Sequence, residues 1–497
     1  MTISTFEFDG KQLREKILDL AVRGKLVAQD QHDETTDILL SNIKAEKARL
    51  IKEKKIRRVK PSSQITDEEK GFDIPKNWAW VRLRDISNFM GGCAYKSKLY
   101  VKKSDNQVIR LGNVKNDQLA LEKDPIFIND EYAKATNKYS IKEGNLLFTM
   151  TGTRNKRDYF FTLLVNRDDL QNKKLYLNQR VGCLNYIFNV DKHWLNYILK
   201  SQFILNEVFK NETGTANQGN IGAGKTMQIP IPLPPLEEQK RIAAKISRLF
   251  DQIDKIESAS QQYAELRLSL RFKVLDIAIH GKLVEQDSTD EPASMLLDKI
   301  KAEKAELIKE KKIRKSKPLP EIAEDEKPFD IPDSWEWVRL GDIGSWAAGD
   351  TPSRQHPEYY GGNIPWLKTG DLTDGIVNTT SENITKLGVE NSSVKLNKPG
   401  NVLIAMYGAT IGKLGIVGDK EIVTNQACCG CSLFDGVYNW YLFYYLLASR
   451  KRLIELGSGG AQPNISKKKI ENFVFPLPPL AEQKRIVTKL EKIFATL

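Results

Sequence analysis

The stretch Pro232–Ile242, PLPPLEEQKRI, occurs a second time at Pro476–Ile486 as PLPPLAEQKRI. After the first copy, the chain continues from Leu236 to His280 without a glycine or a proline. Two prolines followed by two glutamates, as at the start of this run, are typical of a helix N-terminus. The sequence therefore predicts one long helix over 236–280, roughly 65 Å long at about 1.5 Å per residue.

Apolar residues recur in this predicted helix at alternating spacings of four and three, as in a coiled-coil seam. They are Ile242, Ile246, Leu249, Ile253 and Ile256, then Tyr263, Leu270, Val274 and Ile277, with Ser260 and Arg267 interrupting the pattern. A second copy is split between the chain ends: Ile486, Leu490, Ile493 and Leu497, then Phe6, Leu13, Ile17 and Leu20, with Gly10 a candidate break. We expect an antiparallel coiled-coil pair, and two separate buried helices are the alternative.

Three further blocks recur, each at an offset of 257 residues. They are IKAEKARLIKEKKIRR at 43–58 and IKAEKAELIKEKKIRK at 300–315, KILDLAVRGKLVAQD at 16–30 and KVLDIAIHGKLVEQD at 273–287, and FDIPKNWAWVRLRDI at 72–86 and FDIPDSWEWVRLGDI at 329–343. The closing PLPPL motifs have an offset of 244 residues, and the sequences between the blocks diverge. The repeats therefore predict a duplicated frame that carries two different inserts.

These repeats divide the chain into five predicted parts. Residues 1–71 hold the distal half-helix and a basic helix, 72–235 the first insert, 236–328 the central long helix and a second basic helix, 329–479 the second insert, and 480–497 the first half of the distal coiled-coil helix. Short alternating segments such as Trp78–Leu83 and Trp335–Leu340 indicate strands in α/β inserts, with the tryptophans as core anchors. We expect an α+β fold, a pseudo-twofold circular repeat, and chain ends that lie close together.

The repeated basic helices are predicted over Asp37–Arg58 and Leu296–Lys315. Residues 43–58 contain eight Lys or Arg against two Glu. Such a run is often a solvated helix face, whereas its repetition favours a shared role in binding a partner or a phosphate backbone. Both interpretations stay open.

Composition excludes several classes of protein. The 497 residues carry a net charge of +12, which suits a polyanionic partner, and the length suits several domains. The longest apolar run, Trp440–Ala448, is too short to span a membrane, and the first residues have no signal-peptide pattern. The cluster Cys428, Cys429 and Cys431 lacks further zinc ligands. We expect a cytoplasmic protein without structural disulfides or bound metal.

One segment matches a nucleotide-binding motif by letter. Gly219–Thr226, GNIGAGKT, fits the P-loop pattern, and a nucleotide hydrolase using Lys225 is therefore an alternative. The prolines after it should prevent the required helix, and the counterpart at 463–470 has no glycine. The histidines, which are His32, His193, His280 and His356, are scattered. We predict no catalytic site.

The ends of both inserts resemble a known family. Ile-Pro-x-x-Trp leading into Trp-x-Trp-Val-Arg-Leu-x-Asp-Ile, at 74–86 and 331–343, and the two closing motifs are similar to those of DNA-specificity subunits of Type I restriction–modification systems. The resemblance implies that 72–235 and 329–479 are target-recognition domains, each reading half of a bipartite, asymmetric site in double-stranded DNA. A non-catalytic DNA-binding scaffold or inhibitor without sequence readout is the alternative.

The resemblance also implies the partners. The coiled coil would bind two modification (methyltransferase) subunits, with restriction/translocase subunits joining them. S-adenosylmethionine, ATP and Mg would belong to those subunits, and this chain would bind no cofactor. Our candidates for docking and the coiled coil are Ile242, Ile246, Leu249, Ile253, Ile486, Leu490 and Ile493.

The candidates for DNA contact are basic and amide side chains in the inserts. In the first insert they are Lys96, Lys98, Arg110, Arg154, Lys156, Arg157, Arg180, Gln218 and Asn220; in the second, Arg354, Lys368, Lys413, Gln462, Asn464, Lys467, Lys468 and Lys469. The four amides align in pairs within glycine-rich segments at 214–222 and 457–466. They could contact adenine or bond to backbone, and each basic residue has ordinary surface charge as its alternative.

Overall fold

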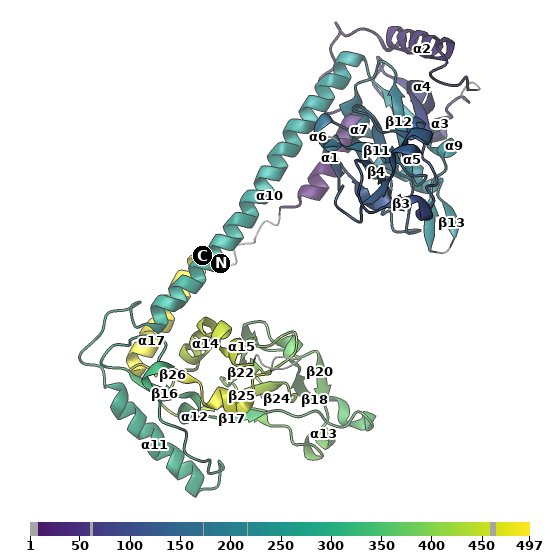
Figure 1. Cartoon of the computed structure of the whole chain (residues 1–497). Helices are drawn as coiled ribbons and strands as arrows, with labels where there is room; N and C mark the ends of the chain where they lie inside the picture. Colours follow the sequence, from purple (N-terminus) through teal and green to yellow (C-terminus); the bar gives the residue numbers. More distant parts are fainter. Residues whose placement is uncertain (1–7, 60–62, 172, 216, 458–463) are drawn as a thin grey trace. The chain divides into compact units, whose positions relative to one another are not determined.

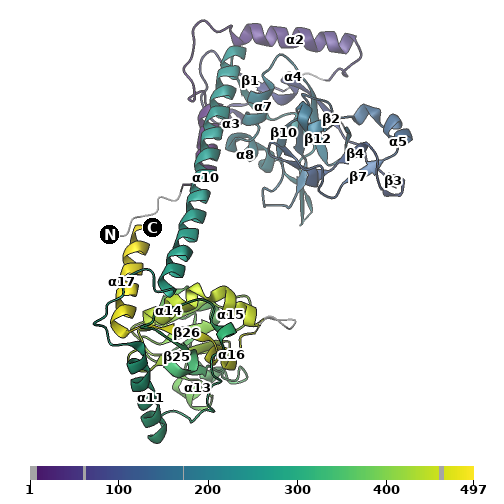
Figure 2. The ribbon, with the colours of Figure 1, turned by 60° about the vertical axis from the view of Figure 1, so that its left-hand side comes forward.

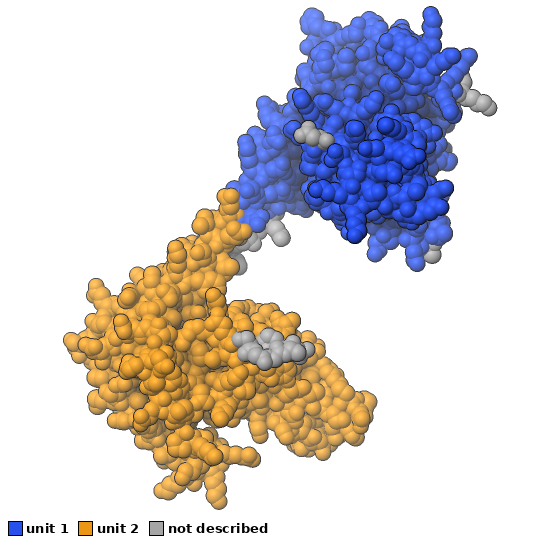
Figure 3. All heavy atoms as spheres, in the orientation of Figure 1, with its two compact units in different colours: residues 1–261 blue, residues 262–497 orange. Residues whose placement is uncertain are grey.

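The computed structural model describes residues 8–59, 63–171, 173–215, 217–457 and 464–497. The chain forms two compact units, residues 1–261 and 262–497 (Figure 3). Each unit combines helices with short strands, so the predicted mixed α/β class is confirmed. Helix α10 (Leu236–Ile279) has 44 residues and begins in the first unit, which confirms the long helix (Figure 1).

The first unit holds helices and strands in this chain order. The helices are α1 (Gly10–Val22), α2 (Thr36–Lys52), α3 (Asp67–Lys70), α4 (Leu83–Ile86), α5 (Asp130–Ala135), α6 (Arg167–Leu170), α7 (Lys192–Ile198), α8 (Gln202–Lys210) and α9 (Ala223–Thr226). The strands are β1 (Ala79–Arg82), β2 (Ser87–Gly91), β3 (Tyr100–Val101), β4 (Asn106–Ile109), β5 (Val114–Lys115), β6 (Gln118–Leu119), β7 (Ile126–Ile128), β8 (Leu146–Thr149), β9 (Thr151–Gly152), β10 (Thr162–Leu164), β11 (Lys174–Leu177), β12 (Val181–Ile187), β13 (Thr213–Thr215), β14 (Gln218–Asn220) and β15 (Pro230–Leu233).

The second unit repeats the frame with a different insert. Its helices are α11 (Ala293–Lys309), α12 (Leu340–Ile343), α13 (Lys386–Glu390), α14 (Asn439–Ala448), α15 (Arg450–Gly457), α16 (Lys467–Glu471) and α17 (Leu480–Thr496). Its strands are β16 (Glu336–Arg339), β17 (Gly344–Ala348), β18 (Tyr360–Leu367), β19 (Gly375–Val377), β20 (Glu382–Ile384), β21 (Leu396–Asn397), β22 (Val402–Ala405), β23 (Leu414–Val417), β24 (Ile422–Thr424), β25 (Cys428–Leu433) and β26 (Val474–Leu477).

The sheets differ between the inserts. The first insert contains two four-stranded sheets, ordered β10-β8-β12-β2 and β11-β4-β7-β3, and a three-stranded sheet β13-β14-β9. The second contains a five-stranded sheet, β17-β25-β22-β23-β19, and a four-stranded sheet, β20-β18-β24-β21. The two inserts therefore differ in sheet architecture as well as in sequence.

The two ends of each insert meet in the same way. Strand β1 pairs antiparallel with β15, which places Trp80 opposite Pro232. In the second unit β16 pairs antiparallel with β26, and Trp337 lies opposite Pro476. The opening and closing motifs therefore form a two-stranded ladder at the base of each insert.

The closing motif places a buried carboxylate in the first unit. The Glu238 carboxylate accepts hydrogen bonds from Trp78 Nε1 at 3.0 Å and from Gln29 Nε2 at 2.6 Å. Arg241, one turn further along α10, pairs with Asp33 at 2.6 Å. We call this set of five residues the frame clasp.

The same clasp exists in the second unit, with equivalent residues. Glu482 accepts from Trp335 Nε1 at 2.8 Å and from Gln286 Nε2 at 2.5 Å, and Arg485 pairs with Asp290 at 2.7 Å. Both tryptophans are buried, which confirms them as core anchors. The duplicated sequence therefore builds duplicated contacts.

Each unit has a core shared by frame and insert. In the first unit Ile242 and Ile246 of α10 lie in one hydrophobic cluster with Trp78 and with Phe148 and Trp194 of the insert. In the second unit, residues of α17 and the end of α10 join residues of α14 and β26 in a corresponding cluster. The inserts are therefore packed onto the frame rather than tethered to it.

Helix α10 also makes equivalent contacts with the split second copy of the long helix. The Arg14 guanidinium of α1 lies 5.9 Å from the Phe250 ring centre and donates to Glu257 at 2.8 Å. In the second unit Arg271 lies 4.6 Å from the Phe494 ring centre of α17. Helix α1 begins at Gly10, where the sequence suggested a break. Phe6 and Met1 lie outside the described residues, so the closeness of the chain ends stays a prediction.

The basic helices are shorter than predicted at their C-terminal ends. Helix α2 ends at Lys52 and α11 at Lys309, six residues before the predicted limits. Lys54 and Lys311 have left-handed φ values of 56° and 59°, and the amides that follow bond back to the carbonyls of Leu50 and Leu307. Such a left-handed residue ends a helix because the backbone can no longer continue the α-helical path.

Glu238→Ala should destabilise the first unit by about 2–4 kcal/mol, because it leaves the buried Trp78 donor and the Gln29 donor without their acceptor. Glu482→Ala should do the same in the second unit. The matched control is Glu237→Ala, which removes an exposed carboxylate from the adjacent position and should change stability by about 0.5 kcal/mol or less. Urea unfolding followed by tryptophan fluorescence measures the effect, and equal losses for Glu237→Ala and Glu238→Ala would contradict it.

Candidate nucleic-acid interface

The structure brings several first-insert candidates together on one surface. Arg154, Lys156 and Arg157 are exposed on the turn between β9 and β10. Arg154 Nη1 donates to the Gly214 carbonyl at 3.3 Å, which ties this turn to the β13–β14 hairpin. The side chain of Gln218 is exposed on that hairpin. The turn and the hairpin therefore form a continuous polar surface with three positive charges.

Contacts limit what individual members of this surface can do. Arg157 donates to Asn206 Oδ1 at 2.9 Å and lies 5.3 Å from the Phe209 ring centre, so its guanidinium has a fixed position. Asn220 accepts a hydrogen bond from the Thr213 hydroxyl at 3.2 Å. This bond ties the Asn220 side chain to Thr213 on the paired strand of the hairpin, whereas the Gln218 side chain is exposed to solvent.

The remaining first-insert candidates lie elsewhere. Lys96 and Lys98 are exposed just before β3, and Arg180 is exposed before β12. Arg110 is half-buried and donates to the Asp124 carbonyl at 2.6 Å. Arg110 therefore supports its own loop.

In the second insert Arg354 and Lys368 meet at one carboxylate. Arg354 pairs with Glu382 at 2.5 Å, and Lys368 pairs with the same group at 3.1 Å. The Arg354 guanidinium also lies 4.1 Å from the Tyr360 ring centre and 5.3 Å from that of Trp366. The hydrogen bond from Arg354 is the main cause that lowers the pKa of Glu382 to about 2.

Sequence reasoning missed the carboxylate and the two rings of this group. Glu382 follows Lys368 by 14 residues, and no local pattern joins them. Strand pairing does, because β20 lies beside β18 and places Glu382 opposite Trp366. The group holds two cations and one anion, so it keeps one net positive charge for a polyanion.

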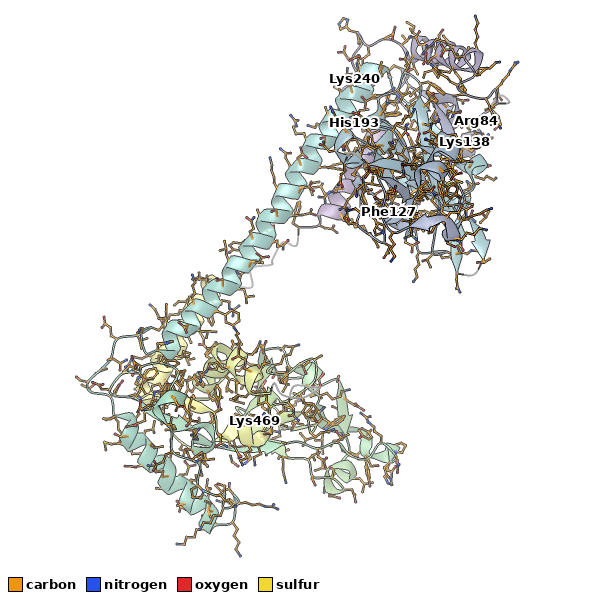
Figure 4. The ribbon with its side chains drawn as sticks, in the orientation of Figure 1. Arg84, Phe127, Lys138, His193, Lys240 and Lys469 are labelled. Carbon is orange, nitrogen blue, oxygen red and sulfur yellow. The ribbon has the colours of Figure 1, made fainter. Side chains whose placement is uncertain are left out.

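The other second-insert candidates are dispersed. Lys467 pairs with Glu471 at 3.3 Å, and Lys469 Nζ, labelled in Figure 4, donates to the Leu456 carbonyl at 2.5 Å. Lys468 is exposed and Lys413 is half-buried. Asn464 forms an isolated bridge with Tyr407, and Gln462 lies outside the described residues.

The side chains of the docking and coiled-coil candidates lie in the hydrophobic cores of the two units. The side chains of Ile242, Ile246, Ile253, Ile486 and Leu490 are at most 2% exposed. The remaining two, Leu249 of α10 and Ile493 of α17, are half-buried against the same clusters. Since these residues belong to the chain's own cores, a partner subunit would have to contact other faces of the helices.

A cavity of about 640 Å³ lies where α7 meets the first turn of α10. His193 and Lys240, both labelled in Figure 4, line it together with Asp191 and Lys192. Its lining mixes acids and bases, and the sequence offered no sign of it because its walls come from frame and insert.

The P-loop-like segment has a different structure from a P-loop. It begins within the hairpin strand β14, forms the single helical turn α9, and leads to strand β15 at Pro230. The Thr226 hydroxyl donates to the Gly222 carbonyl at 3.2 Å. The one helical turn departs from the expectation of no helix. The chain continues from it into strand β15, so the motif does not open directly into a long helix whose N-terminus could receive phosphates.

The described part of the chain offers neither a metal cluster nor a membrane-spanning helix. No group of three or more His, Cys, Asp or Glu side chains there could hold a metal ion. Cys428, Cys429 and Cys431 are free thiols on β25, and burial raises the pKa of each. No helix among the described residues has both the length and the apolar character needed to cross a membrane.

The Type I restriction modification DNA specificity domain matches this chain twice, at residues 75–266 and at 332–497. The chain belongs to this family. Each specificity-domain match contains an opening strand, an insert, a closing motif and the helix after it. Helices α2 and α11 lie outside both matches.

Curated relatives and a solved structure agree with this family. The chain is 29% identical to the Type I restriction enzyme EcoAI specificity subunit of Escherichia coli, over 98% of this chain and 89% of that subunit. It is 28% identical to the EcoEI specificity subunit of the same organism, over 97% and 89%. The specificity-domain fold is similar to a chain from a structure of a type I R-M system, with a TM-score of 0.56 and 20% identity over 86% of this chain and 92% of that chain.

Arg354→Ala should raise the pKa of Glu382 from about 2 toward its ordinary value of 4.5, because the guanidinium is the main group that stabilises the carboxylate. A lowered folded-state pKa adds stability above pH 4.5 that is lost as the pH falls toward 2, and the variant should lose this dependence. A carboxyl NMR titration, with Glu382→Gln to assign the resonance, measures the pKa. Lys368→Ala is the control and should give a smaller rise; an unchanged pKa in Arg354→Ala would refute the assignment.

Proposed function

We propose that this chain is the DNA recognition subunit of a Type I restriction–modification complex and reads a bipartite, asymmetric site, with one half-site for each insert. The observation that carries the proposal is the duplicated frame clasp, which holds two inserts of different sheet order on equivalent residues. Two different readers on one repeated frame suit a target with two different halves. The net charge of +12 suits DNA.

Base and phosphate contacts are assigned to the inserts. In the first, the turn with Arg154, Lys156 and Arg157 would bind phosphates, and the exposed Gln218 would face base edges. In the second, Arg354 and Lys368 would contact DNA beside Glu382. The carboxylate holds the two cations in place before DNA binds.

The repeated frame is proposed to bind two methyltransferase subunits, with restriction/translocase subunits joining them. The long helix and its split copy would form an antiparallel pair in a circular, pseudo-twofold arrangement that sets the spacing of the half-sites. The paired contacts Arg14–Phe250 and Arg271–Phe494 support this arrangement. Catalysis, S-adenosylmethionine, ATP and Mg would belong to the partners, and the complex would be cytoplasmic.

Docking would use the exposed apolar residues of α10 rather than those that are buried in the core of each unit. Tyr263, Leu266, Leu270 and Phe272 are between 44% and 68% exposed in the second half of this helix. Exposed apolar side chains on a helix surrounded by charged residues are typical of a protein interface.

Leu266→Glu should leave the chain folded but remove the copurifying methyltransferase subunit, because Leu266 is 68% exposed. Ile246→Glu provides the contrast: its side chain is fully buried, so the charge should unfold the first unit. Copurification from the host and circular dichroism measure the two effects. A folded Leu266→Glu chain that retains its partner would contradict docking at this surface.

Deleting the gene in its host should abolish adenine methylation at one bipartite, asymmetric motif, and methylation mapping across the genome measures this. Replacing residues 329–479 with the corresponding segment of a relative should then change only one half of the motif. Altered bases in both halves would refute separate readers. An unchanged methylation map after deletion, in a host where the system is expressed, would favour a scaffold without sequence readout.

A further inference from the structure

Each unit ends its basic helix in the same charged segment. Residues 52–58, KEKKIRR, and 309–315, KEKKIRK, each contain five Lys or Arg and one Glu. All ten basic side chains are exposed. We call the two segments the basic tips.

Contacts hold each tip against its own unit. Ile56 inside the first tip is only 7% exposed and belongs to the hydrophobic core. Lys47 Nζ donates to the Arg84 carbonyl at 2.7 Å and joins α2 to α4, which lies beside it in Figures 1 and 2. In the second unit Lys304 donates to the Gly341 carbonyl at 2.8 Å. The charges therefore have a defined position relative to the insert of the same unit.

Most charges of the tips are not neutralised within the chain. Lys55 pairs with Glu53 at 2.8 Å, and Lys312 pairs with Glu310 at 2.8 Å. Among the described residues, no acid pairs with the other basic side chains of the tips, which are Lys52, Lys54, Arg57, Arg58, Lys309, Lys311, Arg314 and Lys315. Each tip therefore presents a concentrated positive charge to solvent.

In each tip a lysine occupies a backbone conformation that glycine adopts more easily. Lys54 and Lys311 occupy equivalent left-handed positions, with φ of 56° and 59°. Glycine adopts this conformation without steric cost and is the common residue there. Both copies have lysine instead, and a second ammonium follows immediately in each.

We propose that each basic tip binds the phosphates of duplex DNA beside the half-site read by the insert of the same unit, irrespective of base sequence. The inference rests on the proposed function. Phosphates are identical at the two half-sites although the bases differ, which fits near-identical tips next to different inserts. A protein partner fits less well, because interface cores are depleted in lysine and the apolar residue of each tip packs against the core of its own unit.

The test uses the full chain with the subunits that copurify from its host. In one variant Lys54, Lys55, Arg57 and Arg58 become Gln; in another Lys311, Lys312, Arg314 and Lys315 become Gln; a third combines them. Affinity for a random-sequence duplex is measured over a salt series. Each contact with B-DNA makes the slope of log affinity against log salt about 0.9 more negative. Two contacts per tip therefore predict a slope that is roughly 2 units shallower in each single-tip variant and roughly 4 units shallower in the combined variant.

A control that removes four charges, as each single-tip variant does, changes exposed frame lysines away from the tips. Lys16, Lys25, Lys273 and Lys282, which are also equivalent pairs, become Gln together. This variant should keep the wild-type salt slope. The preference for DNA containing the methylated motif over random DNA should stay unchanged in all variants, since the tips read no bases.

A glycine double variant distinguishes a DNA-binding role of the two left-handed lysines from a structural role. Lys54→Gly with Lys311→Gly relieves both left-handed positions, so the melting temperature should rise. The salt slope should become about 0.9 shallower for each of the two lysines. A higher melting temperature with an unchanged slope would overturn the inference.

The remaining outcomes distinguish this inference from the proposed function. A wild-type slope in the combined tip variant, with motif methylation intact, overturns phosphate binding by the tips and leaves the proposed function standing. Loss of a copurifying subunit with an unchanged slope also overturns it, because the tips would then bind protein. Failure of gene deletion to change methylation refutes the proposed function whatever the tips do.

Discussion

Each unit depends on one carboxylate that is removed from water. Glu238 and Glu482 are at most 1% exposed, and burial raises the pKa of both, while tryptophan and glutamine donors oppose that rise. A buried carboxylate is costly unless donors surround it. The helix, the opening strand and the segment that supplies Gln29 or Gln286 must therefore meet before the group is satisfied.

Consecutive residues of the closing motif extend this constraint to the insert. Gln239 Oε1 accepts from the Asp191 amide at 2.9 Å, and Gln483 Oε1 accepts from the Tyr438 amide at 2.7 Å. The same two glutamines donate to the carbonyls of Pro234 and Pro478. The first turn of each of these helices thus makes hydrogen bonds to the frame, to the base of the insert and to the residues at the helix N-terminus. The sheets of the insert can therefore differ between the two units, provided that a backbone amide of the insert and its closing strand still meet this helical turn.

The basic side chains proposed to bind DNA form two groups, which differ in whether acidic side chains of the chain pair with them. Arg354 and Lys368 are held by an internal carboxylate, so DNA would meet cations that are already positioned and partly neutralised. Among the described residues, the basic tips lack such acids apart from Glu53 and Glu310. Positioned charges suit readout of a defined site, whereas unpaired exposed charges suit a salt-dependent attraction to any phosphate backbone.

The sequence by itself determined the duplicated frame, the long helix, the strands that follow Trp78 and Trp335 and the family, because repeats, helix-start signals and alternating patterns can be recognised from the order of the residues alone. It also identified the basic side chains, but it could not show that Arg354 and Lys368 share Glu382 or that the Arg154 turn meets the Gln218 hairpin. Those contacts join strands distant in the chain. The tertiary structure alone decided which apolar residues of α10 are buried and which are exposed, because a heptad pattern continues along the helix whereas the inserts and partner helices cover only parts of it.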